Sequence, residues 1–122
     1  MTYKNYTELD VWLKSRRLVN HIFDLTKTFP KEELYGLASQ MRRCAVSIPS
    51  NIAEGCGRNH TKDSIQFFYI SRGSIYEIET QLYLAFDQKY ISQEELEHIL
   101  SLITECKKLI NGFINYYNTL TK

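Results

Sequence analysis

The sequence is poor in the residues that build turns, since it has only 5 Gly and 2 Pro among 122 residues. This scarcity argues against a β-sandwich, whose many short strands need frequent turns. The chain also lacks an apolar run of about 18 residues, so we expect no transmembrane helix. Residues 1–6 show no basic cap followed by an apolar run, and thus no sign of a signal peptide. One globular domain spanning residues 1–122 is expected, without a membrane partner.

Cysteine and net charge are also low. The three cysteines, Cys44, Cys56 and Cys106, are odd in number and have no paired spacing. This usage argues against a disulfide scaffold and favours a reducing, cytoplasmic environment, while the reactivity of Cys56 stays open. Fifteen basic and fourteen acidic residues give a net charge of +1, so the overall charge points to no particular partner.

The sequence lacks the residue spacings that enzymes and metal sites require. Cys56 and His60 have no two further ligands that would complete a zinc site. The pair Glu95 and His98 has the spacing of a di-iron bundle but no second copy. Gly55-Cys56-Gly57 is too short for a nucleotide-binding loop. We therefore expect no catalytic residues, cofactor, metal or small-molecule substrate.

Apolar residues recur with alternating steps of three and four, which predicts amphipathic helices. Four such helices are expected, at about 8–29, 34–55, 62–89 and 93–120. Their main buried rows are Val11, Ser15, Leu18, Ile22, Leu25 and Phe29; Leu37, Met41, Cys44 and Ile48; Phe68, Ile75, Leu82 and Phe86; and Leu96, Ile99, Ile103, Cys106, Ile110, Phe113, Tyr117 and Leu120. With short connections between them, these helices predict an all-α, antiparallel up-down-up-down four-helix bundle.

Capping residues and prolines set the expected helix ends. Thr7 and Thr61 are the expected N-caps of the first and third helices, and Ser92 forms a capping box with Glu95 in front of the fourth. Pro30 is expected to end the first helix, because the residue before a proline avoids the helical region. Pro49 falls inside the second helix, where it predicts a kink.

The third helix carries a second apolar row beside its core row. Tyr69, Tyr76, Tyr83 and Tyr90 recur every seven residues, Arg72 and Glu79 lie between them, and Ile70 and Leu84 lie towards the opposite side. Two interpretations are open. The tyrosines lie at the core boundary with their hydroxyls in water, or this surface is a subunit interface, where tyrosine is enriched.

Basic residues gather near the end of the second helix. Arg42, Arg43, Arg58 and Lys62 flank it with Glu54 as the one opposing charge, and Lys14, Arg16 and Arg17 lie on the first helix. These residues could form a patch for the phosphate backbone of RNA or single-stranded DNA. The alternative is a solvated face or a set of ion pairs between subunits.

One segment closely resembles the hallmark of a known family. The stretch Ser39-Gln40-Met41-Arg42-Arg43-Cys44-Ala45-Val46-Ser47-Ile48-Pro49-Ser50-Asn51-Ile52-Ala53-Glu54-Gly55 is similar to the motif of the bacterial four helix bundle proteins, which are encoded by intervening sequences in 23S rRNA genes and are also called S23 ribosomal proteins. Residues 9–12, 29–37 and 72–82 match as well. Cys44 and Cys56 depart from the family pattern, which often has alanine or a polar residue there.

The resemblance implies a ring-like homopentamer without an established molecular function. A more distant relative, the accessory protein of diversity-generating retroelements, is a similar pentamer that binds nucleic acid through basic surfaces. Two function classes therefore stay open: a nucleic-acid-associated accessory module, or a scaffold whose partner is another protein.

The same motif has a physical interpretation. Ser47 and Asn51 flank Pro49, and their side chains can supply hydrogen bonds where the proline removes one from the helix. Glu54 lies near the helix end, where the helix dipole disfavours a carboxylate. It is therefore expected to pair with Arg43, Arg58 or an arginine of a neighbouring subunit.

Overall fold

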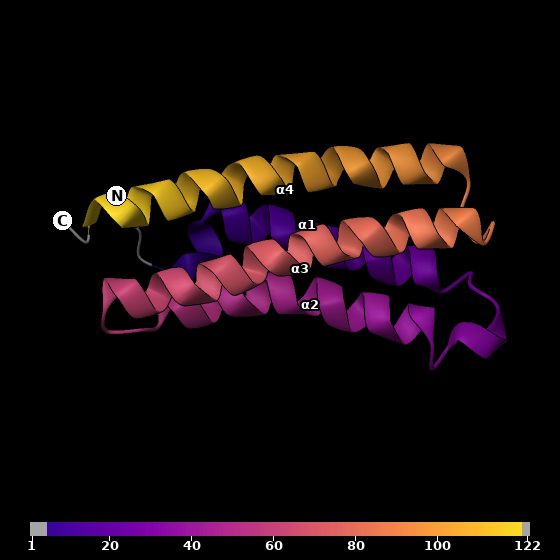
Figure 1. Ribbon diagram of the computed structural model, residues 1–122, viewed down its shortest axis with the longest axis horizontal. Coiled ribbons are helices and arrows are strands. Elements are labelled where there is room, and N and C mark those ends of the chain that lie inside the picture. Colours follow the sequence, from indigo (N-terminus) through magenta and orange to yellow (C-terminus); the bar gives the residue numbers. More distant parts are fainter. Residues whose placement is uncertain (1–4, 121–122) are drawn as a thin grey trace.

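The computed structural model describes residues 5–120, which fold into four long helices. These are α1 (Asp10–Thr26), α2 (Leu37–Cys56), α3 (Thr61–Asp87) and α4 (Gln93–Leu120). Two short 3-10 turns, η1 (Tyr6–Glu8) and η2 (Lys31–Glu33), precede α1 and α2. The helices lie side by side and alternate in direction, and α4 runs the full length of the bundle (Figure 1). The all-α up-down-up-down architecture predicted from the sequence is confirmed.

The predicted apolar rows form the core. Side chains such as Leu18, Met41, Phe68 and Ile103 are completely buried, each on a different helix. The row of α4 is buried from Leu96 to Ile114, but Leu120 at its end is half exposed. The last turn of α4 therefore lies at the edge of the core.

The first helix differs from the prediction at both ends. The N-cap position of α1 is Leu9, which makes no side-chain hydrogen bond, so the prediction of Thr7 as N-cap was wrong. Thr7 lies within η1, where the Asn5 side chain accepts a 3.1 Å hydrogen bond from the Thr7 amide. The Glu8 carboxylate completes a capping box by accepting from the Asn5 amide, and the box begins η1 rather than α1. α1 ends at Thr26, before Phe29 and Pro30.

The second helix begins at Leu37, three residues later than predicted, because residues 31–33 form a separate 3-10 turn. The carboxylate of Glu33 accepts a 3.0 Å hydrogen bond from the Leu37 amide. It also accepts a 2.7 Å hydrogen bond from the Tyr90 hydroxyl, which comes from the connection between α3 and α4. α2 then continues through Pro49 as far as Cys56.

The connection between α3 and α4 combines one predicted and one unpredicted cap. The Ser92 hydroxyl accepts from the Glu95 amide and the Glu95 carboxylate accepts from the Ser92 amide, which confirms the capping box. Lys89 has a φ of 65°, and the Tyr90 amide donates to the Ala85 carbonyl. This is a Schellman motif with lysine at the left-handed position that glycine usually takes.

The start of α3 lies close to the end of α2 because Gly55 has no side chain. A Cβ atom at Gly55 would lie 2.5 Å from Phe68 Cε1 and 2.9 Å from the Ser64 carbonyl oxygen. α3 itself begins at Thr61, and its N-cap position is His60 without a side-chain hydrogen bond. The prediction of Thr61 as N-cap was therefore wrong by one residue.

Candidate interaction surfaces

One face of α3 is apolar and exposed to solvent. It carries five large side chains whose exposed fractions run from 38% to 53%: Tyr69, Ile70, Tyr76, Tyr83 and Leu84. We call these five residues the α3 ridge. Their spacing follows the helix repeat, so they lie along a single face opposite Phe68, Ile75 and Leu82. A row of this kind on one helix is unusual for an isolated small bundle, in which exposed apolar side chains are mostly scattered.

The fourth tyrosine of the sequence row does not belong to the ridge. Tyr90 lies beyond the end of α3, where its ring packs against Phe29 with centroids 5.2 Å apart. The row of four tyrosines predicted from the sequence is therefore a row of three on the surface, and Tyr90 has a structural role.

Two of the charged residues between the ridge tyrosines, Arg72 and Glu79, bond to α4. A guanidinium nitrogen of Arg72 donates to Asn111 Oδ1 at 3.2 Å, and the Lys107 ammonium lies 2.8 and 2.9 Å from the two carboxylate oxygens of Glu79. Arg72 and Glu79 thus have partners within the chain, although the sequence placed both at a subunit interface.

Two of the ridge tyrosines, Tyr69 and Tyr76, also make cation–π contacts within the chain. The Arg72 guanidinium lies 4.8 Å from the ring centroid of Tyr69, and the Lys107 ammonium lies 4.3 Å from that of Tyr76. Such cation–π contacts restrict the two rings while leaving part of each exposed.

A glycine lies within the ridge. Gly73 is in the middle of α3, and a Cβ atom added there would meet nothing within 4 Å. Glycine in a helix interior is less favourable than alanine by roughly 0.5–1 kcal/mol. Among residues 5–120, nothing around Gly73 requires that this position lack a side chain.

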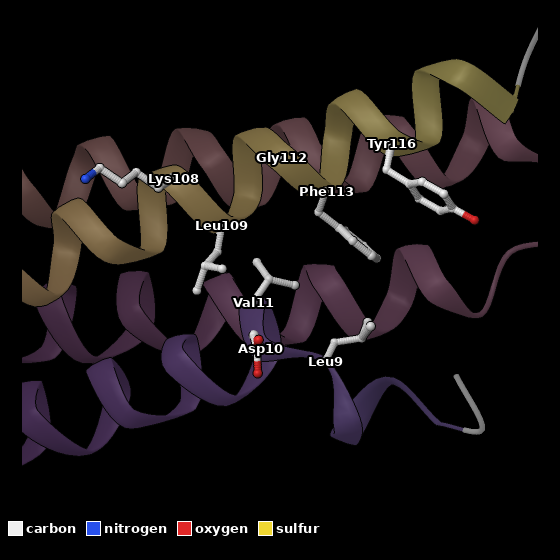
Figure 2. Close-up of a pocket in the computed structure, with 8 residues that line it drawn as sticks. All are labelled: Leu9, Asp10, Val11, Lys108, Leu109, Gly112, Phe113 and Tyr116. Carbon is white, nitrogen blue, oxygen red and sulfur yellow. The ribbon is translucent and has the colours of Figure 1, made fainter. Parts of the chain in front are cut away.

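A second apolar surface is a pocket of about 370 Å³ between the start of α1 and the C-terminal half of α4. Its lining residues are Leu9, Asp10, Val11, Lys108, Leu109, Gly112, Phe113 and Tyr116. Leu109 and Phe113 extend from α4 towards Val11 and Leu9, and Gly112 leaves the space between them open (Figure 2). A Cβ atom at Gly112 would also meet nothing within 4 Å.

Three of the six candidate nucleic-acid-binding residues have partners in the chain. Lys14 pairs with Glu105 at 3.0 Å. Arg58 pairs with Glu54 at 3.1 Å and lies over the ring of Phe67. Arg42 is half-buried against α1, donating to the Thr26 hydroxyl at 2.8 Å and lying over Phe23.

The remaining candidates, Arg17, Arg43 and Lys62, are exposed and have no ion pair within residues 5–120. Arg17 lines the groove between α1 and α4, whereas Arg43 is on α2 and Lys62 is in the first turn of α3. Arg43 and Arg58 are fifteen residues apart, which is roughly 22 Å along a helix. The structure therefore does not gather the basic residues into one patch on a single chain.

Sequence reasoning missed a histidine pair in the groove between α1 and α4. The rings of His21 and His98 meet edge to face with centroids 5.2 Å apart. Burial, the nearby His98 and Arg17 lower the pKa of His21. Asp24 and Glu95 line the same groove, but no three ligating side chains within residues 5–120 come together as a metal site.

Two of the cysteines are unreactive core residues. Burial raises the pKa of the Cys44 thiol to about 12 and that of the Cys106 thiol to about 11, so neither is a thiolate at neutral pH. Cys44, Cys56 and Cys106 form no disulfide.

A family model and a solved structure match this chain over most of its length. The family model of the 23S rRNA-intervening sequence proteins matches residues 7–112. The chain belongs to this family. A solved structure of a Bacteroides thetaiotaomicron protein of unknown function, from the S23 ribosomal protein family, is similar with a TM-score of 0.79 and 28% identity; the match covers 85% of this chain and 97% of that one. No curated protein matches significantly.

The 23S rRNA-intervening sequence protein motif of residues 39–55 lies in α2. Ser47 Oγ donates to the Cys44 carbonyl at 2.6 Å and lies 2.7 Å from Ser74 Oγ on α3. Asn51 Nδ2 donates to the Ser47 carbonyl at 2.7 Å. The carbonyl that loses its amide donor to Pro49 is that of Ala45, so these side chains bond other carbonyls nearby.

This part of the motif therefore links α2 to α3. Ser71 on α3 donates to the Ile48 carbonyl at 2.8 Å, and Cys44 Sγ donates to the Ser74 carbonyl at 3.2 Å. The cation that pairs with Glu54 is Arg58, one of those expected. No helix within residues 5–120 has the length and apolar character that crossing a membrane would need.

Proposed function

We propose that this family member is a non-enzymatic, self-assembling scaffold whose subunit contacts involve the α3 ridge. The observation that carries the proposal is the ridge itself, five large apolar side chains exposed on one helix face. Burying such a row against another copy removes apolar surface from water, which is the main driving force of association. The resemblance to the family implies that five copies assemble into a ring. The three cysteines, which form no disulfide, support a cytoplasmic setting.

The charges around the ridge support the same proposal. Glu79 pairs with Lys107 within the chain, and Arg72 donates a hydrogen bond to the uncharged side chain of Asn111. Covering the edge of the ridge therefore leaves Glu79 with its counter-ion and Arg72 with a hydrogen-bond acceptor. A buried charge with neither kind of partner would be costly to desolvate.

Sedimentation velocity tests the proposal with a matched pair of variants. The wild-type chain is expected to sediment as an oligomer, and the variant Ile70→Ser/Leu84→Ser as a folded monomer. Leu34→Ser is the control, because Leu34 and Leu84 are both 48% exposed but Leu34 is outside α3. If the double variant keeps the wild-type sedimentation coefficient, the ridge is not the contact.

Binding of RNA or single-stranded DNA is a second candidate function, supported by the exposed Arg17, Arg43 and Lys62, which have no ion pair within residues 5–120. A ring repeats each of these cations, and linked weak sites can raise avidity about 100-fold or more. Binding should then weaken steeply with the logarithm of salt concentration.

A titration with RNA and with single-stranded DNA at about 50 mM salt tests this second function, because counterion release strongly favours association there. An Arg17→Ala/Arg43→Ala variant should flatten the salt dependence, whereas Arg58→Ala, whose guanidinium is paired with Glu54, should change it little. Absence of binding by the wild-type chain at that salt leaves the scaffold as the function.

A further inference from the structure

Two glycines in helix interiors have no role that residues 5–120 explain, and they lie on different surfaces. Gly73 lies on the same face of α3 as the ridge, and Gly112 lines the apolar pocket on α4. Of the others, Gly55 makes room for Phe68, Gly36 lies against Glu33 in front of α2, and Gly57 lies at the C-cap of α2, outside both surfaces. Helix glycines with open space around them fit a close approach by another molecule.

We infer that the α3 ridge of one copy packs into the Gly112 pocket of the next copy, with the Tyr76 ring inserted in the pocket. This inference rests on the proposed self-assembly and adds its geometry. A two-fold contact uses the same patch on both subunits and would need only one of these surfaces. Two distinct apolar surfaces, each with an unexplained glycine, favour a head-to-tail contact.

The chemistry of the pocket suits a tyrosine. Leu9, Val11, Leu109 and Phe113 give it apolar walls, while Asp10 supplies a carboxylate. A buried tyrosine needs an apolar surrounding for its ring and a hydrogen-bond partner for its hydroxyl. Asp10 can accept that hydrogen bond, which an aliphatic side chain could not donate.

Tyr76 is the ridge tyrosine best placed for insertion, because it is the most exposed of the three, at 50% against 48% for Tyr83 and 38% for Tyr69. It lies one helical turn after Gly73, so a neighbouring backbone can come close beside it. Lys107 lies over its ring at 4.3 Å and is itself held by Glu79 at 2.8 Å. The ring is therefore already restricted before association, which lowers the entropy lost on binding.

Such a contact has a consequence for assembly. α3 carries the ridge, whereas the pocket is formed by α4 and the start of α1. In a row of copies joined in this way, one ridge stays free at one end and one pocket stays free at the other. Further copies can therefore add until the free ridge and the free pocket bind each other. A head-to-tail contact of this kind closes into a ring when the rotation between copies allows it.

A mixing experiment tests the inference with two variants of the full chain. Gly112→Leu fills the pocket but keeps the ridge, and Tyr76→Ala removes the inserted ring but keeps the pocket. Each variant alone is expected to be a folded monomer at micromolar concentration. Their equimolar mixture should form a dimer of twice the 14.4 kDa chain mass, because it contains one intact ridge and one intact pocket.

Controls keep this test interpretable. Tyr35→Ala removes a tyrosine that is 92% exposed but lies outside the ridge, and should assemble like the wild type. Tyr76→Phe should weaken association about tenfold, as expected for one lost hydrogen bond to a charged group. Substitutions of Gly112 by residues of increasing size, from Gly112→Ala to Gly112→Leu, should progressively weaken assembly. Circular dichroism should show that each of these variants keeps the helicity of the wild type.

The possible outcomes are distinguishable. If folded Gly112→Leu assembles as the wild type does, the pocket is not used and the inference is wrong, although self-assembly stands. If both variants are monomeric but the mixture contains no dimer, the head-to-tail pairing is wrong. If the wild-type chain is itself monomeric, both the inference and the proposed function fail.

Discussion

The hydroxyl of Tyr90 donates a 2.7 Å hydrogen bond to the carboxylate of Glu33, joining residues 57 positions apart. Glu33 also accepts from the Leu37 amide. One carboxylate therefore caps α2 and fixes the connection between α3 and α4 at the same end of the bundle. The hydrogen bonds from Leu37 and Tyr90 lower the pKa of Glu33, and the bond to Glu33 raises the pKa of Tyr90.

Tyr90→Phe should lower the melting temperature by a few degrees near neutral pH, because it removes this hydrogen bond and keeps the ring packed on Phe29. Tyr35→Phe, at an exposed position, is the control and should leave the melting temperature unchanged. Thermal unfolding followed by circular dichroism makes the comparison. Equal melting temperatures for Tyr90→Phe and wild type would contradict a stabilising role.

The same hydrogen bond predicts a dependence on pH. Folding lowers the pKa of Glu33 below its ordinary value of 4.5. The ionised Glu33 carboxylate therefore stabilises the fold above pH 4.5, and this stabilisation disappears as pH falls through the lower pKa of the folded state. The pKa of Tyr90 is raised from 10.0, so its contribution is lost as pH rises through the folded value. The difference in melting temperature between wild type and Tyr90→Phe should shrink at both extremes. A difference that is constant at all pH values would argue against this pair as its source.

Lys89→Gly should stabilise the chain by about 0.5–1 kcal/mol, because glycine adopts a positive φ at no steric cost. Lys89 has a φ of 65° at the end of α3. Gln88→Gly is the matched control: Gln88 has a φ of −78°, so glycine there should destabilise. Urea unfolding of both variants gives the two free energies of unfolding, and the opposite order would refute the argument.

Gly55→Ala should destabilise the bundle by about 1–3 kcal/mol, the usual cost of overpacking a filled site. The added Cβ would lie 2.5 Å from the Phe68 ring and 2.9 Å from the Ser64 carbonyl oxygen. At Gly57 the nearest atoms lie 3.6 and 3.7 Å from such a Cβ, so Gly57→Ala should have little effect. Similar losses of stability in the two variants would show that close approach at Gly55 is not the cause.

Ile103→Asp should prevent folding, because Ile103 is completely buried and an unpaired buried charge costs several kcal/mol. Ile70→Asp adds the same charge at a 53% exposed position and should fold, while disturbing the ridge. Circular dichroism at room temperature separates the two cases. If the Ile103→Asp variant folds, the conclusion that this face of α4 lies in the core is wrong.

The sequence was sufficient to predict the helices and the core, because both follow from local periodicity. The rows through Leu18, Met41 and Ile103 are buried as their spacing requires. The Ser92–Glu95 capping box is also local and was found from four consecutive residues. The start of α2 could not be predicted in the same way, since the Glu33 carboxylate that caps it also depends on Tyr90, far along the chain.

The candidate surfaces were only partly predictable. The spacing of Tyr69, Tyr76 and Tyr83 showed that α3 has a second apolar face, but it could not show that Tyr90 leaves the row. Nor could it show that Arg72 and Glu79 bond to α4. The pocket around Gly112 and the pair of His21 with His98 each join α1 to α4, and such pairings arise only when the helices pack.

We propose above all that another copy of this chain covers the exposed ridge of α3. Light scattering coupled to size exclusion, on the unmodified chain at micromolar concentration, measures this most directly. We expect a mass that is a multiple of 14.4 kDa, and five times that value for the pentamer that the family resemblance implies. A single species at 14.4 kDa would contradict the proposal.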